Sequence, residues 1–180
     1  KGKQLGTIGD WGCYSFFPTK NIGAMGDAGA LCAKDASHLL KAKQLRNHGD
    51  ISRYEHAFVG GNFRLDALQA AFLRIKLPLL NSWIAQRRAN AAYYKEMLKD
   101  CEFLTLPSEM PECLHSFNQF TLRLKNNLRD AFKDYLTAAG IGNQVYYPIP
   151  LHRQKCFEKN FIECPEADKA CKEVISIPIF

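Results

Sequence analysis

Two short apolar runs near the start of the chain flank a loop rich in glycine. Residues 12–17, GCYSFF, are aromatic and strand-like, and residues 29–33, GALCA, form a second apolar run. Apolar runs of this length, bounded by turn residues, are typical of strands. The pattern therefore predicts a buried strand, a loop that contains Lys20, and a second short strand.

The segment DASHLLKAKQLRNHG is predicted to be a helix of about three turns. Asp35 stands at the expected N-cap, because a short polar side chain there can accept a hydrogen bond from an unpaired backbone amide. Gly49 stands where a helix often ends. Three leucines, Leu39, Leu40 and Leu45, lie on one side of this helix.

A longer helical pattern occupies the middle of the chain. Apolar residues recur at three- and four-residue spacing between Leu65 and Leu79, and the pattern resumes between 80 and 98. Asn62 could cap this helix, and Pro78 should kink or break it because proline lacks the backbone donor. A helical run of about 35 residues is long for one core, so we expect it to link two lobes.

The last third of the chain predicts a small α/β lobe. Residues 116–124 alternate polar and apolar positions, as a half-buried strand does. An amphipathic helix follows and ends at Gly140, and residues 143–150, NQVYYPIP, are predicted to be a second strand that prolines stop. A helix with Pro165 near its start then leads into a last apolar strand.

Composition favours a globular protein with a solvated surface. The 180 residues are 47% hydrophobic and 23% charged, and the net charge is +6. The Lys and Arg residues are spread along the chain and largely interleaved with acidic residues, rather than gathered in a stripe. We therefore expect no nucleic-acid partner. No apolar run approaches the ~20 residues of a membrane span, so we expect no membrane partner.

The cysteines and the two ends of the chain add two expectations. Seven cysteines, an odd number without a CxxC pair, argue against a disulfide framework and against a zinc site, so we expect no metal and a cytoplasmic location. The chain begins at Lys1 and ends on the apolar run VISIPIF, which is typical of a part cut from a longer protein.

Lys20 is the main candidate for chemistry. A lysine becomes a nucleophile when partial burial favours its neutral amine, and Tyr14, Phe16 and Phe17 could supply apolar surroundings. The glycines after Lys20 could let the backbone approach a ligand, and Ser15 offers a hydroxyl for an anion. An amine, an aromatic wall and anion donors suit pyridoxal phosphate. The alternative is a solvated turn lysine, which proline and glycine neighbours also favour.

Four separated motifs resemble one enzyme family. The stretches SFFPTKNIGAMGDAGAL, LRNHGD, GGNFRLDALQAAFL and YYPIPLH, in this order along the whole chain, look like those of the DegT-type nucleotide-sugar aminotransferases. These are pyridoxal-phosphate enzymes of fold type I. The resemblance implies an α/β chain in which residues 1–60 form the C-terminal part of the cofactor-binding large domain, residues 61–100 the linking helices, and residues 101–180 a truncated small domain.

The resemblance also assigns roles to individual residues. It maps the lysine that carries the cofactor to Lys20, the serine that contacts the phosphate to Ser15, and the acidic position of the glycine loop to Asp27. Asn62 maps to an asparagine that reaches the cofactor phosphate of the neighbouring subunit, which implies a homodimer with shared active sites. His152 matches the family motif PLH and is a candidate substrate residue, as is Tyr54, although a plain loop role remains open for both.

The implied reaction is amino transfer. An amino-acid donor, commonly glutamate in this family, gives its amino group to a keto-sugar attached to a nucleotide, and Lys20 moves the proton as general base and acid. Family members that perform dehydration have histidine in place of this lysine, so Lys20 favours a transaminase. The acidic residue that pairs with the cofactor's ring nitrogen should lie before Lys1, so we expect this chain alone to be inactive.

Other residues and other functions remain open. His48 suits a structural place at a helix C-terminus, His56 a loop or sugar-site role, and Arg64 an interface or helix-start ion pair. Two rival functions come from other classes: a non-catalytic relative that uses the fold for regulation, and an inert fragment. Intact Lys20 and Ser15 count against the first.

Overall fold

The computed structural model describes residues 2–160 and 162–180, and they form two compact units that divide after Asn81. Lys1, where the first expected region begins, and Phe161, inside the third, lie outside the described residues. The expected boundaries at 60 and 100 stay predictions. Among the described residues, no helix combines the length and the apolar character that crossing a bilayer requires.

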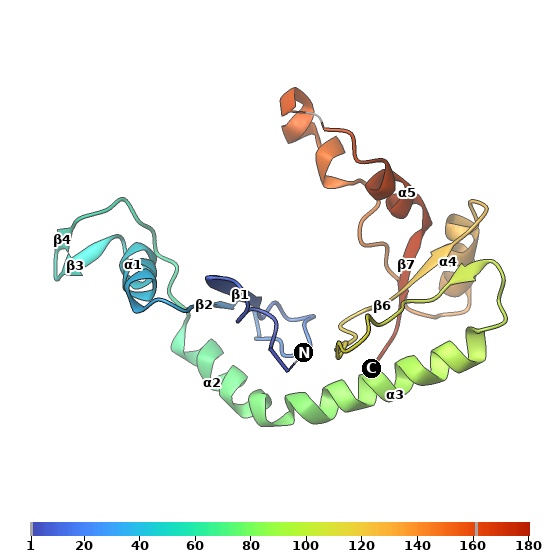
Figure 1. The fold of residues 1–180 in the computed structure, drawn as a ribbon, viewed down its shortest axis with the longest axis horizontal. Coiled ribbons are helices and arrows are strands. Elements are labelled where there is room, and N and C mark those ends of the chain that lie inside the picture. The colour runs from blue at the N-terminus through green and yellow to red at the C-terminus, as the bar shows by residue number, and fades with distance from the viewer. Residues whose placement is uncertain (1, 161) are drawn as a thin grey trace. The chain divides into compact units, whose positions relative to one another are not determined.

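The first unit contains two small antiparallel sheets and two helices (Figure 1). Strands β1 and β2 pair from Trp11↔Ala33 to Ser15↔Gly29, and β3 and β4 form a separate hairpin. Its elements are β1 (Trp11–Ser15), β2 (Gly29–Ala33), α1 (Ala36–Arg46), β3 (Asp50–Ser52), β4 (Glu55–His56), α2 (Ala67–Lys76) and the 3-10 turn η1 (Leu77–Leu79). The sequence did not predict the β3–β4 hairpin.

Both ends of α1 follow the local chemistry expected of them. The Asp35 carboxylate accepts the Ser37 backbone N–H at 2.7 Å, so Asp35 is the N-cap. At the other end the Gly49 N–H donates to the Gln44 carbonyl at 2.7 Å, and Gly49 has the positive φ of 78° that glycine tolerates best. No residue of α1 is buried in this chain.

Strand β1 is less buried than its sequence predicted. Only Gly12 is buried in it, Trp11 is 42% exposed, and Phe17 just beyond the strand is 48% exposed. The reason is that β1 pairs only with β2, and a two-stranded sheet cannot enclose the side chains on both of its faces.

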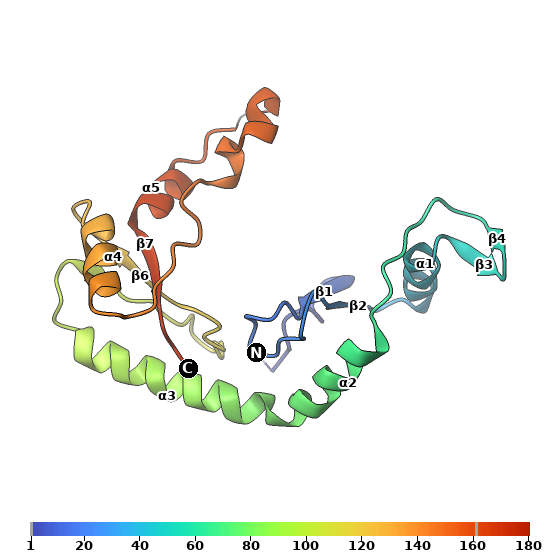
Figure 2. The ribbon, with the colours of Figure 1, turned by 180° about the vertical axis from the view of Figure 1, so that it is seen from behind.

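The second unit is built on a three-stranded antiparallel sheet in the order β5–β6–β7. Figure 2 shows β6 and β7 side by side with α4 next to them. Its elements are α3 (Leu80–Leu98, which begins two residues before the division), β5 (Leu104–Thr105), β6 (Phe120–Leu124), α4 (Arg129–Ala138), the 3-10 turns η2 (Leu151–Arg153) and η3 (Lys155–Asn160), α5 (Pro165–Glu173) and β7 (Val174–Ile177).

The core of the second unit explains its strand pattern. Phe120, Leu122 and Leu124 point to one face of β6 and are at most 1% exposed, while the residues between them are half-buried. The α4 helix ends as expected at Gly140, which has a positive φ of 71°.

The expectation for Pro78 was confirmed, and the expectation of a strand over residues 143–150 was wrong. Pro78 does break the regular helix, as the 3-10 turn η1 between α2 and α3. Residues 143–150, however, form no strand: only Gln144 pairs, in an isolated bridge with Ser176. Pro148 and Pro150 carry no backbone N–H, so this stretch cannot continue a ladder.

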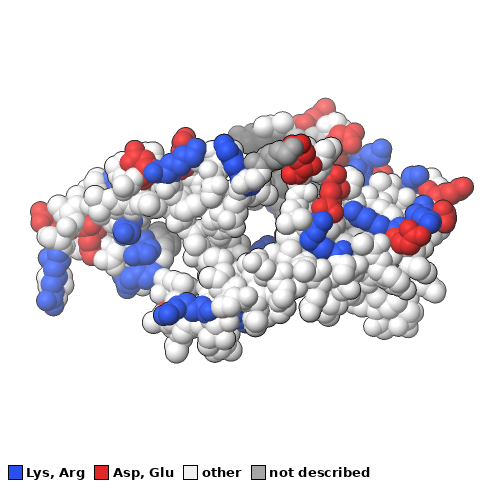
Figure 3. All heavy atoms as spheres, turned by 60° about the horizontal axis from the view of Figure 1, so that its bottom comes forward, with Lys and Arg blue, Asp and Glu red and all other residues white. Residues whose placement is uncertain are grey.

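Charged side chains are mixed on the surface. On the face drawn in Figure 3, Lys and Arg are interspersed with Asp and Glu and do not gather into one basic stripe. This distribution is the one that the sequence indicated for a solvated surface.

Candidate active site around Lys20

Lys20 lies in a tight turn just after β1. The Lys20 N–H donates to the Phe17 carbonyl at 2.9 Å, which places Pro18 and Thr19 at the two central positions of the turn. Proline favours the first of these because its φ is already set near the value that the turn needs. The local sequence FPTK therefore fixes the backbone at Lys20.

Two backbone hydrogen bonds of Phe16, the residue that follows β1, close the loop that carries Lys20. The Phe16 N–H donates to the Ala28 carbonyl at 2.8 Å, and the Phe16 carbonyl accepts the Ala24 N–H, also at 2.8 Å. Ala24 is 3% exposed, so the point of closure is buried. Residues 17–23 thus form a short closed loop with Lys20 near its middle.

The Lys20 side chain is exposed in this chain, whereas the sequence predicted partial burial. Of the aromatic residues before it, Tyr14 belongs to a two-stranded sheet, while Phe16 and Phe17 lie beyond the strand and Phe17 is 48% exposed, so they do not enclose the turn. Within residues 2–160 and 162–180, no carboxylate forms an ion pair with its amine. Lys20 is therefore not used for a surface ion pair there, and its amine is accessible.

The glycines at every third position have a structural cause. A Cβ at Gly23 would lie 2.3 Å from the Pro18 carbonyl oxygen, and a Cβ at Gly29 would lie 2.9 Å from the Tyr14 carbonyl oxygen. Neither glycine has a positive φ, so a left-handed backbone conformation is not the reason for them. They are glycines because the backbone packs closely there, against Pro18 of the same loop at Gly23 and against Tyr14 of β1 at Gly29.

Ser15 lies at the end of β1, five positions before Lys20, and is exposed. Its Oγ accepts the Phe17 N–H at 3.3 Å. Since a hydroxyl both accepts and donates, this contact leaves the Ser15 hydrogen available for an anionic oxygen. An accessible amine on this loop and a hydroxyl donor at the end of the preceding strand fit a cofactor that has an aldehyde and a phosphate.

The sequence allowed Asn62 to be the N-cap of the next helix, but the structure shows that it is not. Helix α2 begins at Ala67, and Asp66 occupies its N-cap position. Asn62 lies in an extended segment, where it forms an antiparallel bridge with Asn47, and the Phe63 N–H donates to the Arg46 carbonyl at 2.9 Å. This backbone pairing at the end of α1 prevents a helix from starting at Asn62.

A polar network supports this segment. Arg64 Nη1 donates to Asn47 Oδ1 at 2.5 Å, and Asn47 in turn donates to Asp50. His56 Nδ1 lies 2.7 Å from Asp50 Oδ1 and 3.1 Å from the His48 carbonyl. In these contacts Arg64 is bonded to an amide rather than to the carboxylate of an ion pair, and His56 braces the hairpin.

The two candidate substrate residues lie in different units. Tyr54 is at the turn between β3 and β4, with φ of 68° and 81% of its side chain exposed. His152 belongs to η2, its side chain is 11% exposed, and its Nε2 lies 3.3 Å from Asp168 Oδ1. Substrate roles for both stay predictions.

Asp168 also pairs with Arg153. The Arg153 guanidinium forms two hydrogen bonds to the carboxylate, one of them at 2.8 Å. This donor, with a smaller contribution from His152, lowers the pKa of Asp168 to about 2. Asp168 is in the first turn of α5, so the pair fastens η2 to that helix.

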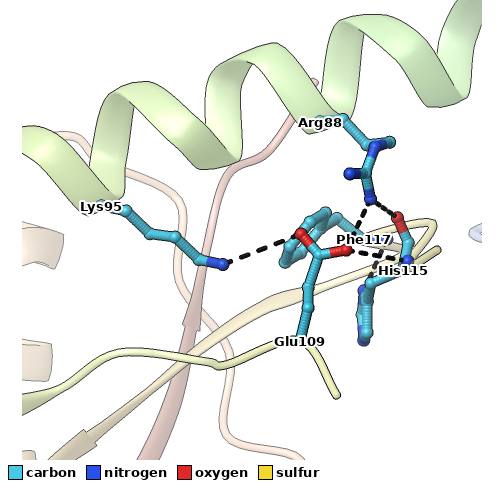
Figure 4. Close-up of polar contacts among 5 residues, drawn as sticks. All are labelled: Arg88, Lys95, Glu109, His115 and Phe117. Carbon is cyan, nitrogen blue, oxygen red and sulfur yellow. Dashed lines mark hydrogen bonds and ion pairs between the residues drawn. The ribbon is translucent and has the colours of Figure 1, made fainter. Parts of the chain in front are cut away.

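A second polar network in this unit, centred on Glu109, was not predicted from the sequence (Figure 4). Arg88 of α3 donates to Glu109 Oε2 at 2.8 Å and to the His115 carbonyl at 2.7 Å, while Lys95 Nζ lies 3.9 Å from Glu109 Oε1. The Phe117 N–H donates to His115 Nδ1 at 2.9 Å. These contacts lower the pKa of Glu109, chiefly through the hydrogen bond from Arg88, and tie the loop to α3. Phe117, which is 1% exposed, is thereby anchored in the core.

Comparison with known proteins decides the family. The model of the DegT/DnrJ/EryC1/StrS aminotransferase family matches residues 1–180. The chain belongs to this family. The membership agrees with the resemblance of the four sequence motifs.

Similar members of the DegT/DnrJ/EryC1/StrS family differ in their names. The chain is 43% identical over 180 residues to UDP-N-acetyl-3-dehydro-alpha-D-glucosamine 3-aminotransferase of Acidithiobacillus ferrooxidans, with 99% of this chain and 48% of that protein covered. It is 41% identical over 184 residues to a pleiotropic regulatory protein of Geobacillus stearothermophilus, with 99% and 49% covered. Similarity alone therefore does not separate an enzyme from a regulator.

A solved structure of the family matches the fold. The crystal structure of DesV from S. venezuelae in complex with a ketimine intermediate superposes with a TM-score of 0.93 at 35% identity, over 99% of this chain and 48% of that chain. The match confirms the mixed α/β fold of a pyridoxal-phosphate aminotransferase. The chain spans about half the length of the relatives that it matches.

The described residues contain no cluster of three or more His, Cys, Asp or Glu side chains that could hold a metal ion. Asp27, the acidic position of the family's glycine loop, is exposed on the segment between Lys20 and β2. The sequence motifs predicted Lys20, Ser15 and Asn62 as cofactor-site residues, and these roles stay predictions. They did not indicate which side chains hold the Lys20 loop in place.

Proposed function

We propose that this chain forms the C-terminal half of a pyridoxal-phosphate-dependent aminotransferase that acts on a nucleotide-linked keto-sugar. The observation that carries the proposal is the exposed Lys20 amine, which has no ion-pair partner among the described residues and follows the exposed Ser15 by five positions, in a chain that belongs to an aminotransferase family. The names of the relatives support a nucleotide-sugar substrate. The amino donor is an amino acid, and glutamate fits the family resemblance.

Each residue has a defined task in this proposal. Lys20 Nζ holds the cofactor covalently, and Ser15 donates a hydrogen bond to its phosphate. The cofactor, when bound, supplies an electron sink that makes the donor's α-proton acidic. Lys20 Nζ would accept that proton as general base and deliver it again as general acid within the same half-reaction, and it would carry out the reverse transfer in the second half.

The proposal extends to the assembly and the compartment. Asn62 would reach the cofactor phosphate of the partner subunit in a two-fold homodimer, so each active site would need two chains. The cysteines are all free, which supports a reducing, cytoplasmic location. Tyr54 and His152 would face the sugar-nucleotide.

Borohydride labelling tests the proposal. The full-length protein is loaded with pyridoxal phosphate, reduced, digested and analysed by mass spectrometry. The cofactor mass should appear on the peptide that contains Lys20, and Lys20→Ala should abolish the label and the amino transfer from glutamate. Lys43→Ala, an exposed lysine of α1, is the matched control and should behave as wild type.

The same experiment separates the regulatory alternative, which the name of one relative favours. A regulator that never takes up the cofactor, or a label on a different lysine, would contradict the proposal. A protein that binds the cofactor at Lys20 but transfers no amino group to any nucleotide-linked keto-sugar would support the regulatory function instead.

A further inference from the structure

Two side chains of α2 are bonded to the loop that follows Lys20. Gln69 Oε1 accepts the Met25 backbone N–H at 2.8 Å, and Lys76 Nζ donates to the Gly23 carbonyl at 2.6 Å. The two residues are seven positions apart, which is about two helical turns, so they lie on the same face of α2. Leu73, the one buried residue of α2, lies between them on that face.

The contact at Gln69 is close enough to exclude a side chain from the loop. A Cβ at Gly26 would lie 2.8 Å from Gln69 Nε2. The Gln69 amide group therefore covers Gly26 while its oxygen holds the neighbouring Met25 amide. The helix thus contacts the loop backbone directly.

Lys76 is not used as a surface charge. Its side chain is half-buried, and no carboxylate pairs with it among the residues that the structure describes. Its ammonium group instead donates to a backbone carbonyl, and a hydrogen bond from a charged donor is stronger than one between neutral groups. A lysine held in this way acts as an anchor for the loop.

These two contacts lie close enough in the chain to Lys20 to restrict the position of its amine. Gly23 is three residues after Lys20, and Ala24 closes the Lys20 loop by its bond to Phe16. The two contacts of α2 bracket that point of closure, at Gly23 and at Met25. Movement of the loop away from α2 would loosen the turn that presents the Lys20 amine.

We propose that Gln69 and Lys76 are positioning residues for Lys20. Neither touches substrate or cofactor. By holding the segment 23–25 against α2 they restrict where the Lys20 amine lies, and proton transfer depends steeply on that position. The test of this inference has two arms. The kinetic arm rests on the proposed aminotransferase function, whereas the structural arm does not depend on it.

The structural arm uses hydrogen exchange of the cofactor-free, full-length protein, resolved to single amides. Gln69→Leu removes the acceptor, so exchange at Met25 should become about fivefold to tenfold faster, as expected for the loss of one hydrogen bond. Gln69→Glu keeps an acceptor oxygen at the same place and should restore the protection. The paired amides of β1 and β2 should exchange as in wild type in both variants.

The kinetic arm uses the loaded enzyme. Lys76→Met keeps the aliphatic stem but removes the donor, and we expect kcat to fall about fivefold to tenfold, while KM for both substrates changes less than twofold. The pH dependence of the bound cofactor's absorbance should shift as well. Lys76→Arg keeps the donor and should restore both, and Arg74→Ala, an exposed basic residue of the same helix, should leave both unchanged.

The outcomes are separable. If borohydride does not label Lys20, the proposed function fails, whatever the exchange data show. If Lys20 is labelled but Met25 exchange and the pH dependence are the same in wild type, Gln69→Leu and Lys76→Met, the positioning role is wrong. If Gln69→Leu or Lys76→Met does not fold, the folded Gln69→Glu and Lys76→Arg variants decide: loss of Met25 protection in the first, or of wild-type kcat in the second, would overturn the inference.

Discussion

Asn62 offers a test of whether the active site is shared between two subunits. Within its own chain its side chain makes little contact: Asn62 Oδ1 is 3.4 Å from the Arg64 backbone N–H, which is longer than the usual 2.7–3.2 Å of such bonds. The pairing of residues 61–63 with the end of α1 uses backbone atoms that an alanine retains. Asn62→Ala should therefore lower the free energy of unfolding by less than about 1 kcal/mol.

The expected loss of activity is much larger than this loss of stability. If Asn62 binds the phosphate of the partner subunit's cofactor, Asn62→Ala and Lys20→Ala homodimers are each poorly active. A heterodimer of the two variants has one site with both defects and one site with neither. Its activity should reach about half of the wild-type activity per dimer, by the symmetry of the two sites.

The assay is amino transfer by heterodimers that carry two different affinity tags and are purified over both. The matched control is a heterodimer of Lys20→Ala with Ser15→Ala. In the proposed assignment Lys20 and Ser15 serve the cofactor of their own subunit, so each of the two sites in this heterodimer keeps a defect and no activity should return. Purified Lys20/Asn62 heterodimers that are no more active than this control would remove Asn62 from the shared site.

Three further predictions concern local structure. Gly23→Ala should destabilise the protein and weaken its retention of the cofactor on dialysis, because the added Cβ would lie 2.3 Å from backbone atoms of Pro18; wild-type retention and thermal unfolding would contradict this. Leu122→Ala, at a residue that is 0% exposed, should cost about 2–5 kcal/mol in urea unfolding. The Asp168 pKa is lowered to about 2 from an ordinary 3.8, so its stabilising effect is present above pH 4 and is lost as pH falls towards 2. The stability difference between wild type and Asp168→Asn should shrink over that interval in acid unfolding, and a constant difference would argue against the bond to Arg153.

Helix ends were predictable from the sequence because they depend on neighbours a few residues away. Asp35 caps α1 and Gly49 closes it, and Gly140 ends α4, each through a contact within about one turn. The predicted strand at 143–150 did not form, for a reason that is only partly local: Pro148 and Pro150 interrupt it, and it also lacks a partner. Strand formation needs a partner elsewhere in the chain, and only Gln144 finds one.

The Lys20 loop shows the same division between local and distant causes. The turn at Pro18 follows from the adjacent residues, and the motif alone predicts the role of Lys20. The cause of the glycine spacing required the structure, since it depends on the carbonyls of Tyr14 and Pro18 and on Gln69. The Gln69 and Lys76 contacts join residues 44 and 53 positions apart, and no periodicity within one segment could have predicted them.

The arrangement has a consequence for how mutations should act on this protein. Lys20 and Ser15 are exposed and their side chains make few contacts within the described chain, so replacing them removes little packing. Core residues such as Phe120 and Leu122 belong to the other compact unit and are 0% exposed. Loss of function and loss of stability should therefore separate cleanly: a substitution at Lys20 should give a folded, inactive protein, whereas one in the sheet should lower stability first. Gln69 and Lys76 lie between these extremes, because their contacts contribute both to the stability of the loop and to the placement of the Lys20 amine.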